Sequence, residues 1–279
     1  MKRHLVAFAL VLLVLAPADR AWSDAPPLHA SAPSLPLANG TGTAIYDVKE
    51  HRITGFFTHM YKKGTADTVT ADLADRMDLA VEGVGGPPDE VGYLEGTGIL
   101  REVRRQGALQ VENFYFMPME DAPRRHLVML VRLTNRGQQA HTATVRAGLD
   151  VHVGAGPQPD PHDPGDDVDH KWRGDQDEVL RAVPGGFFER SPASPHRLMY
   201  LGLNLRAALP AGEVRGQDVK ADFRGELEIA PGQAAWAGVV VAHREGAERA
   251  DLQHNLQGYL GRSTPGRLLE REQDFWRRF

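Results

Sequence analysis

An acidic stretch from Gly154 to Asp177 holds most of the side chains in this sequence whose types and spacing suit metal chemistry. Seven aspartates stand there among prolines and glycines, without any periodicity. Carboxylate oxygens are the ligands that calcium prefers, so Asp166, Asp167 and Asp169 are the candidate metal ligands. Their spacing does not follow the EF-hand pattern, and we favour the alternative of a solvated, mobile insertion. The sequence therefore assigns no cofactor, and calcium is the alternative.

The same region supplies a candidate ligand-binding site. Trp172 has a flat ring that could stack on a sugar, although a lone tryptophan more often anchors a loop by packing. Asp150 and His152 lie on the polar side of the strand that precedes the stretch. We therefore group Trp172, Asp150 and His152 as the candidate ligand-binding residues. His152, His162 and His170 also suggest a transition-metal site, but scattered surface histidines are the simpler interpretation.

No catalytic residue is assigned from the sequence. It contains no Gly-x-Ser-x-Gly elbow, no phosphate-binding glycine loop and no zinc helix motif. An aldose epimerase would need a histidine and a glutamate that converge on one face of the fold. Glu112, Glu178 and His196 are available for such a pair, but nothing in their sequence context singles them out.

The elements that position these residues centre on Val111 to Val153. Between Val145 and Val153, apolar residues alternate with polar ones, which is the period of a strand with one buried face. His126 to Leu133 is apolar at nearly every position, so this strand should be covered on both faces. Turn-forming residues separate the three runs. The sequence therefore predicts an antiparallel meander at the centre of an all-β sandwich.

Two hairpins and two helices complete the expected fold. Thr43 to Val48 should pair with Arg52 to His59, and Phe223 to Ile229 with Ala234 to His243 across a Pro-Gly turn. From Ala247 the apolar spacing becomes helical, first up to Gly261 and then from a Thr264-Pro265 start to the end of the sequence. The second helix carries three aromatic residues near its end, which should be partly exposed or folded back on the sandwich: Phe275, Trp276 and Phe279.

Composition narrows the class of protein. The 279 residues carry a formal net charge of -5 and no cluster of lysine and arginine, which argues against a nucleic-acid partner. There is no cysteine, so a domain of this size must be held together by its core alone. Disulfides and thiolate zinc sites are excluded.

The first residues have the pattern of a secretory signal peptide. Lys2, Arg3 and His4 precede an apolar run from Leu5 to Leu15, which is too short to span a bilayer comfortably. Cleavage is expected after Ala18 or, as we divide the chain, after residue 23; an uncleaved membrane anchor is the alternative. We therefore expect a secreted or periplasmic protein without membrane attachment after cleavage. A flexible lead-in should occupy residues 24–36.

Several motifs together resemble the N-terminal supersandwich domain of bacterial glucoamylase-like six-hairpin glycoside hydrolases. They are the turn Leu37-Ala-Asn-Gly-Thr-Gly, the sequence Gly55-Phe-Phe-Thr-His and the aromatic strand Val111-Glu-Asn-Phe-Tyr-Phe. The resemblance implies a galactose mutarotase-like β-sandwich over residues 37–244, with the acidic loop at 154–177. It also implies a helical linker over residues 245–279, which would lead into an (α/α)6 barrel that the sequence does not contain.

The resemblance therefore implies a non-catalytic module that is truncated before, or split from, its catalytic barrel. In that family the two catalytic carboxylates belong to the barrel, so none is carried over to this sequence. A carbohydrate ligand and a barrel domain or polypeptide docked on the C-terminal helix are the expected partners. The alternatives are a mutarotase-like aldose epimerase that acts alone, or a free carbohydrate-binding protein.

Overall fold

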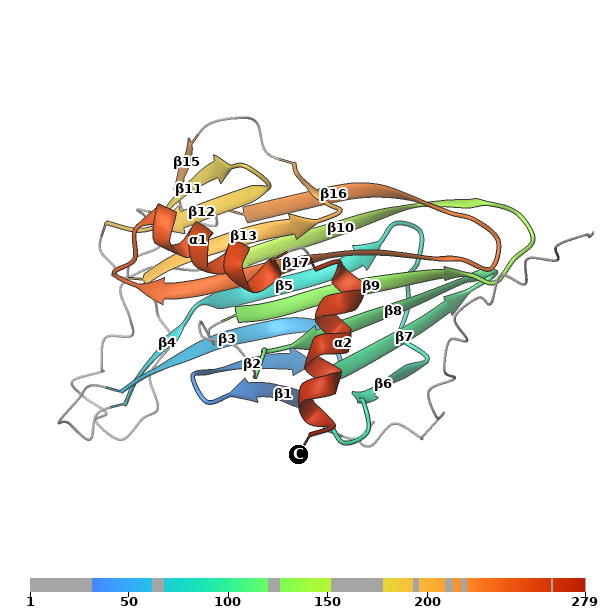
Figure 1. Cartoon of the computed structure of the whole chain (residues 1–279), viewed down its shortest axis with the longest axis horizontal. Coiled ribbons are helices and arrows are strands. Elements are labelled where there is room, and N and C mark those ends of the chain that lie inside the picture. The colour runs from blue at the N-terminus through green and yellow to red at the C-terminus, as the bar shows by residue number, and fades with distance from the viewer. Residues whose placement is uncertain are drawn as a thin grey trace, which may run out of the picture.

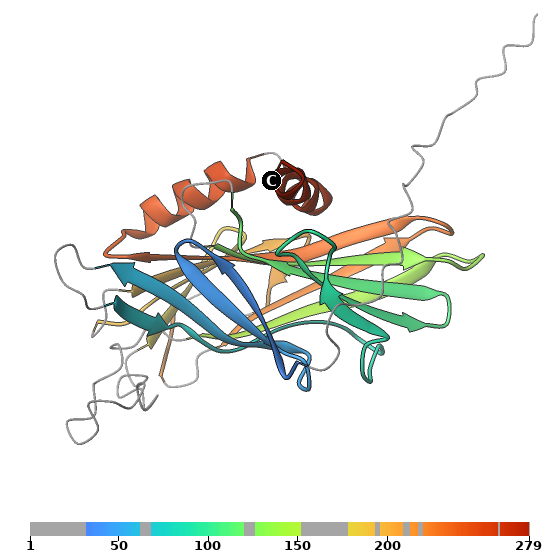
Figure 2. The ribbon, with the colours of Figure 1, turned by 90° about the horizontal axis from the view of Figure 1, so that it is seen from below.

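The protein is built from two large antiparallel sheets and two helices that cover the outer face of one sheet (Figures 1 and 2). The all-β sandwich expected from the sequence is therefore confirmed. The computed structural model describes residues 32–61, 68–119, 126–151, 178–192, 196–208, 213–216, 220–261 and 263–278. The expected signal peptide and the acidic loop lie outside the described residues.

Sheet A has the strand order β1-β2-β3-β5-β10-β16-β14, and β4 pairs with β3. Its bounds are β1 (Ser34–Asn39), β2 (Gly42–Asp47), β3 (Arg52–Tyr61), β4 (Thr68–Asp72), β5 (Ala74–Val81), β10 (His141–Val151), β14 (Arg206–Ala207) and β16 (Lys220–Ile229). The β2–β3 hairpin expected from the sequence is present. Because β1 begins at Ser34, its first residues fall within the stretch expected to be a flexible lead-in.

Sheet B has the order β15-β11-β12-β13-β17-β9-β8-β7-β6. Its bounds are β6 (Glu90–Tyr93), β7 (Leu100–Gln106), β8 (Leu109–Phe116), β9 (His126–Asn135), β11 (Glu178–Val183), β12 (Gly186–Arg190), β13 (His196–Leu203), β15 (Glu213–Gly216) and β17 (Ala234–Glu245). The helices are α1 (Arg249–Leu260) and α2 (Pro265–Trp276), both on the outer face of this sheet (Figure 2).

The three layers explain the hydrophobic pattern of each strand. In sheet A, one face packs on sheet B and the other faces solvent, so β16 alternates between buried and exposed residues over much of its length. In sheet B, the central strands lie between sheet A and the helices, and every residue of β8 is buried. The expectation that β9 is covered on both faces is confirmed over Leu127 to Val131.

Two predicted strand pairings are wrong. The expected meander ends at β9, because β10 crosses into sheet A and pairs with β5 and β16. Likewise β16 and β17 form no hairpin: β16 belongs to sheet A, whereas β17 pairs with β9 and β13 in sheet B. In both places the turn reverses the chain at the rim of the sandwich and moves it from one sheet to the other. Turn chemistry predicts the reversal but not the change of sheet.

The helix limits agree with the sequence signals. Thr264 caps α2, its hydroxyl accepting a hydrogen bond from the Arg267 amide at 3.4 Å, and Pro265 occupies the first helical position. Phe275 and Trp276 are half-buried, and Trp276 rests against Gly98, as expected for aromatics folded back on the sandwich. Phe279 lies outside the described residues.

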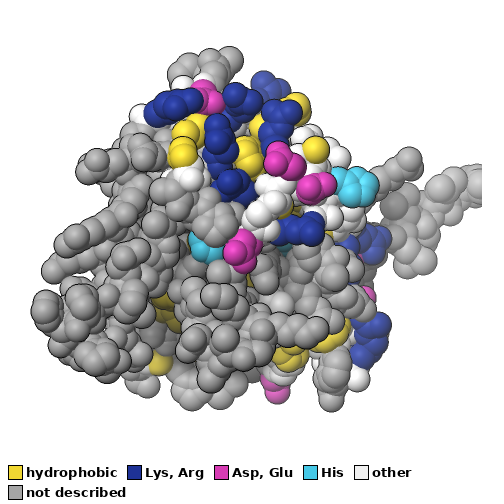
Figure 3. All heavy atoms as spheres, turned by 90° about the vertical axis from the view of Figure 1, so that its left-hand side faces the viewer, with side chains coloured by type: hydrophobic (Ala, Val, Ile, Leu, Met, Phe, Trp, Pro, Cys, Tyr) yellow, Lys and Arg dark blue, Asp and Glu magenta, His cyan; other side chains and the backbone are white. Residues whose placement is uncertain are grey.

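The edge of sheet B at β11 and β15 is charged. Arg181 and Arg215 both pair with Glu213, and Figure 3 shows basic and acidic side chains gathered at this end of the molecule. Hydrogen bonds from these two arginines hold the pKa of Glu213 below its usual value. Charged side chains protect an exposed strand edge from pairing with another chain. Among the described residues, neither helix has the length and apolar character needed to cross a bilayer.

Candidate functional site

Of the candidate ligand-binding residues, the structure describes Asp150 alone. It lies near the end of β10 on the solvent-facing side of sheet A. Trp172, His152 and the proposed metal ligands Asp166, Asp167 and Asp169 fall outside the described residues. The site around Asp150 is therefore built from strands that the sequence did not connect with it.

Three neighbouring strands, β5, β10 and β16, bring charged side chains together on the outer face of sheet A. Each alternates, so its inward residues enter the core and its outward residues form a flat array. Antiparallel register sets these outward residues side by side in rows. Each row takes one residue from β5, one from β10 and one from β16, in that order. The first row is Arg76, Asp150 and Lys220, and the middle row is Asp78, Gly148 and Asp222. The third row is Ala80, Arg146 and Arg224.

Gly148 makes this array hollow. A Cβ atom at this position would lie 3.1 Å from Asp78 Oδ1 and 3.7 Å from Asp222 Oδ1, so both carboxylates stand beside bare backbone. The result is a depression of about 440 Å³, which we call the Gly148 hollow. A side chain in the middle row would fill it. Glycine in a central strand is costly, and close approach to a ligand is one reason for its presence.

The charges around the Gly148 hollow are unequally paired. Asp78 accepts a hydrogen bond from Arg76 at 2.7 Å, and Asp150 pairs with Lys220 at 3.1 Å. Asp222 is exposed, and its carboxylate has no hydrogen-bond or ion-pair partner among the described residues. The second oxygen of Asp150, Oδ1, is buried and likewise lacks a partner there. Acceptor capacity open to a ligand therefore remains on Asp222, beside Gly148.

On the opposite side of the hollow, Glu82 joins Arg146 and Arg224. It pairs closely with Arg146 and lies 3.4 Å from Arg224. Two guanidinium groups thus share one carboxylate and retain donors for other acceptors. With Glu82 included, the cations and carboxylates around the hollow balance in number, so the site offers both donors and acceptors without a net formal charge.

This balance decides which ligands suit the site. A phosphate or a polyanion would meet Asp78 and Asp222, and a cation would meet the arginines. A neutral molecule with several hydroxyl groups fits better, because each hydroxyl both donates and accepts hydrogen bonds. Among the described residues, no group of three or more histidine, aspartate or glutamate side chains is arranged to hold a metal ion.

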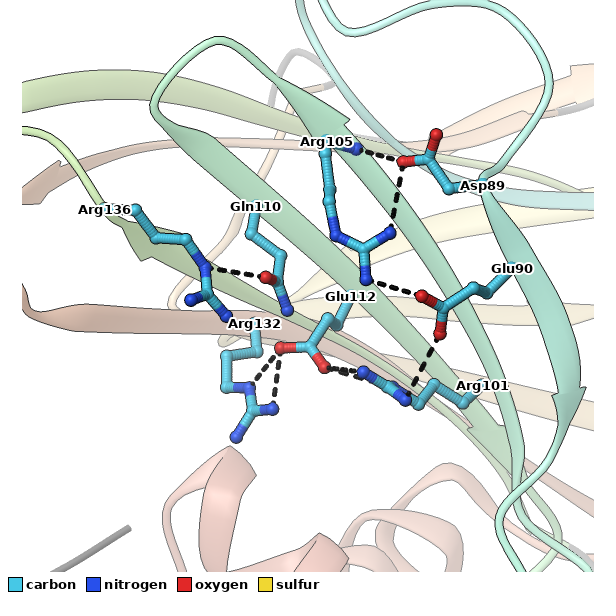
Figure 4. Close-up of polar contacts among 8 residues, drawn as sticks. All are labelled: Asp89, Glu90, Arg101, Arg105, Gln110, Glu112, Arg132 and Arg136. Atoms are coloured by element: carbon cyan, nitrogen blue, oxygen red, sulfur yellow. Dashed lines mark hydrogen bonds and ion pairs between the residues drawn. The ribbon is translucent and has the colours of Figure 1, made fainter. Parts of the chain in front are cut away.

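A second charged network lies on the outer face of sheet B, beside α2 (Figure 4). Glu112 is completely buried and accepts hydrogen bonds from Arg101 at 2.7 and 3.0 Å and from Arg132 Nε at 2.7 Å. Arg101 also reaches Glu90 at 3.7 Å, and the Arg132 guanidinium lies 5.6 Å from the centre of the Trp236 ring. Because both carboxylate oxygens of Glu112 are occupied, this network stabilises the fold and leaves little for a ligand.

A third polar group ties the two sheets together inside the sandwich. Tyr46 of sheet A donates a short hydrogen bond to Glu102 of sheet B, and Arg104 pairs closely with the same carboxylate. Asn113 donates to the Leu79 carbonyl of sheet A at 3.1 Å. Burial raises the pKa of Tyr46 far above its usual value, so its hydroxyl remains a donor. These contacts are sequestered from solvent.

The residues considered for an epimerase do not converge. His196 lies on the inner face of sheet B and contacts His243 at 3.0 Å between ring nitrogens. Glu112 lies on the outer face of the same sheet, in the arginine network. The side chain of Glu178 is outside the described part of the structure. His196 and Glu112 therefore do not form the histidine–glutamate pair that an epimerase would need.

Sequence reasoning missed Asp78, Asp222 and Gly148. The alternation of polar and apolar residues could have shown that these three residues face outward, since each has buried residues on both sides in its strand. Their proximity depends on the pairing of β10 with both β5 and β16, which are far apart in the sequence. A glycine in the middle of the clearest alternating strand was the available signal.

No protein-family model and no curated protein matches this chain. Among solved structures, it is similar to a protein described as a kojibiose phosphorylase from the human microbiome, with 10% identity over 89% of this chain and 36% of that chain and a TM-score of 0.49. It is also similar to a galactose mutarotase related enzyme from Lactobacillus acidophilus, with 7% identity, coverages of 77% and 98% and a TM-score of 0.48.

A galactose mutarotase-like protein from Lactobacillus casei is 8% identical, with coverages of 76% of this chain and 100% of that chain and a TM-score of 0.46. The chain thus spans little more than a third of the length of the phosphorylase. These similarities assign no activity and no family to this chain. Its description as an all-β sandwich rests on its own two sheets and their helical cover.

Proposed function

We propose that this chain is a secreted, non-catalytic β-sandwich module of a carbohydrate-active protein, and that it binds a neutral saccharide in the Gly148 hollow. The observation that carries the proposal is the middle row of the hollow, in which Gly148 exposes backbone between Asp78 and Asp222. Adjacent hydroxyl groups of a sugar can donate to the two carboxylates while accepting from the surrounding arginines.

The module part of the proposal follows from the resemblance of the sequence motifs to the supersandwich of glycoside hydrolases. In that family catalysis belongs to a separate helical barrel, and the sandwich serves as an accessory domain. The helices α1 and α2 fall within residues 245–279, the stretch that the resemblance implies as a linker to such a barrel or a docking site for one. Secretion is proposed from the N-terminal signal pattern.

Calorimetric titration with linear α-glucans tests the proposed binding. Asp222→Asn removes the charged acceptor without changing its shape, and we expect affinity to fall about tenfold or more, because hydrogen bonds to a charged group are among the stronger ones. Gly148→Val should abolish the heat by filling the hollow. Glu228→Gln is the matched control, since Glu228 is exposed on β16 outside the hollow.

Binding that survives both hollow variants would contradict this site. The absence of heat with the wild-type protein across α- and β-linked oligosaccharides would remove the binding function itself. Melting curves for each variant separate loss of binding from loss of folding. Asp222 is exposed and unpartnered among the described residues, so its replacement should leave the melting temperature nearly unchanged.

A second candidate function is aldose epimerisation at the same hollow. It is favoured by the position of two carboxylates, Asp78 and Asp222, on either side of the exposed backbone of Gly148. Epimerisation needs one group that donates a proton and one that accepts it. Polarimetry of freshly dissolved aldose with purified protein tests this candidate. Rates equal to those in buffer would eliminate it, and acceleration lost in Asp78→Asn and Asp222→Asn would replace the binding proposal.

A further inference from the structure

Contrary to the expectation of no lysine and arginine cluster, the outward face of α2 concentrates arginine on the side of the molecule opposite the Gly148 hollow. Its buried residues face sheet B, while its outward residues border a shallow depression of about 950 Å³ at the turn from α1. We call this surface the α2 arginine face; it consists of Arg267, Glu270, Arg271, Asp274, Arg277 and Arg278. Four guanidinium groups oppose two carboxylates there, a formal charge of +2 on a chain whose net charge is -5.

Intramolecular contacts hold this face in place. The Arg271 guanidinium donates to the Tyr259 carbonyl of α1 at 3.1 and 3.2 Å and lies 4.5 Å from the centre of the Tyr259 ring. Arg278 lies 6.0 Å from the centre of the Phe275 ring, and Phe275 meets Trp276 edge-on. A preorganised surface loses less side-chain entropy when a partner binds. Arginine and tryptophan are also the side chains most enriched at interface hot spots.

The neighbouring helix shows that this charge is not a general property of the helical layer. The exposed positions along the body of α1 include Asp251, His254, Gln257 and Gly258, with no arginine beyond the Arg249 that opens the helix. Both helices pack on sheet B through apolar residues. Solubility alone would be served equally by either kind of outward face. The arginines of α2 therefore call for a specific explanation.

We propose that the α2 arginine face docks an acidic surface of another polypeptide. Positive potential favours carboxylates, and the half-buried Phe275 and Trp276 add an apolar contact at one end. A nucleic-acid backbone fits less well, because its evenly spaced phosphates would meet Glu270 and Asp274 between the arginines, whereas the carboxylates of a protein surface can be spaced to match the arginines alone. A bilayer surface fits less well because the face lacks the row of apolar residues needed for insertion.

This inference does not depend on the proposed carbohydrate site. Sheet A bears the Gly148 hollow, and the helices lie beyond sheet B, so the two surfaces are separated by the whole sandwich (Figure 2). Variants on one surface should leave the other unaffected. Failure of either proposal is therefore distinguishable from failure of the other.

Fluorescence anisotropy with a labelled oligoglutamate peptide at low salt tests the docking surface. The double variant Arg267→Glu and Arg277→Glu reverses charge at two exposed positions whose ion pairs are themselves exposed, so folding should persist. We expect its affinity for the peptide to fall at least about tenfold. Arg249→Glu on α1 is the matched control and should change affinity by less than about twofold.

Equal binding by the wild type and the double variant would overturn the inference, as would an equal loss in the α1 control. Heparin fragments and phosphatidylserine vesicles serve as competing probes. If the double variant no longer binds heparin fragments or vesicles but still binds the peptide, the partner is not an acidic polypeptide and the inference fails. The milder pair Arg267→Gln and Arg277→Gln should weaken peptide binding in the same direction, and its melting curve checks the fold.

Discussion

On the outer face of sheet B, Glu112 is buried between Arg101 and Arg132, whereas on the outer face of sheet A Asp222 is exposed and unpartnered among the described residues. Both are carboxylates on strands that pair with a neighbour on each side, and both have arginines nearby. The difference lies in what covers them. The network of Glu112 lies beside the helical layer and is closed, while the array around Asp222 has glycine at its centre and remains open to solvent.

The contrast between Glu112 and Asp222 separates charges that stabilise the fold from charges that can serve a ligand. A buried carboxylate must be matched by its own protein, since desolvation would otherwise be too costly. A surface carboxylate beside a glycine has no such requirement and can serve a ligand. The two faces should therefore respond oppositely to mutation: changes around Glu112 should alter stability, and changes around Asp222 should alter binding.

The largest effect is expected from Glu112→Gln. The substitution keeps the shape but removes the charge that Arg101 and Arg132 share, and it replaces one acceptor oxygen with an NH2 group that cannot accept from an arginine. Breaking such a pair costs roughly 3–5 kcal/mol when both partners are buried. Because the arginines are 24% and 30% exposed, we expect about 2–4 kcal/mol. Denaturant unfolding measures this change. A decrease in the free energy of unfolding below about 0.5 kcal/mol would show that the network contributes little to stability.

A matched pair of glycine substitutions, one at Gly238 in sheet B and one at Gly148 in sheet A, tests whether the covered sheet is packed more tightly than the open one. In sheet B, a Cβ at Gly238 would lie 2.4 Å from the Met129 carbonyl oxygen, so Gly238→Ala must displace backbone in a packed layer. We expect it to destabilise the protein by about 2–3 kcal/mol. In sheet A, Gly148→Ala meets only the end of the Asp78 side chain at 3.1 Å, and stability should change by less than about 1 kcal/mol.

Thermal and denaturant unfolding of both alanine variants measures the difference. The saccharide titration adds a second readout, because Gly148→Ala narrows the hollow whereas Gly238 lies in the other sheet. Similar stability losses in the two variants would mean that the outer face of sheet A is as tightly packed as sheet B. The contrast between an open and a closed face would then be lost.

The covered face should also make stability depend on pH through His126. This residue is buried beneath α1, its ring centre 4.8 Å from that of Tyr259, and its ring nitrogens have no hydrogen-bond partner among the described residues. Burial, with a smaller contribution from Arg271, lowers the pKa of His126 from 6.5 to about 3. Below pH 6.5, His126 binds a proton in the unfolded chain but not in the folded protein. Stability therefore falls as the pH decreases toward 3.

His126→Phe tests this dependence, since phenylalanine keeps a ring against Tyr259 without a titratable group. Between pH 6.5 and 5, the wild type should lose stability relative to the variant by up to about 1.4 kcal/mol per pH unit. Leu130→Val is the control: it weakens the same layer but should shift the stability curve without changing its slope. Parallel curves for the wild type and His126→Phe would show that His126 is protonated in the folded protein.

Much of the fold could be predicted from the sequence because its signals are local. Alternation placed the strands, and Thr264-Pro265 placed the start of α2. The pairing of β9 with β10 and of β16 with β17 was predicted wrongly, because a turn does not reveal that the chain has changed sheets. The hydrophobic pattern did contain the answer. Alternating strands such as β10 and β16 form the half-solvated sheet A, and β9, which is apolar at nearly every position from His126 to Leu133, lies in the covered sheet B.

The site was less accessible to sequence reasoning. Asp150 was identified from its phase on a strand, and it does lie in the Gly148 hollow. Asp78 and Asp222 reach the hollow only through pairings of high sequence separation, each of which depends on register. A shift of one residue in β5 or β16 would turn either carboxylate into the core. The face of the sheet on which each carboxylate lies could therefore be predicted from the sequence, but the proximity of the carboxylates to one another could not.

The smallest expected effect, that of Asp222→Asn on stability, provides the most direct test of the contrast with Glu112. Asp222 and Asp78 lie in the same row on either side of Gly148, so removal of the Asp222 charge lessens the repulsion between them and breaks no described side-chain hydrogen bond. The free energy of unfolding should stay within about 0.5 kcal/mol of the wild type, with any change toward greater stability. A loss comparable to that of Glu112→Gln in parallel denaturant curves would mean that Asp222 is bound into the fold, and the case for a ligand at Gly148 would lose its free acceptor.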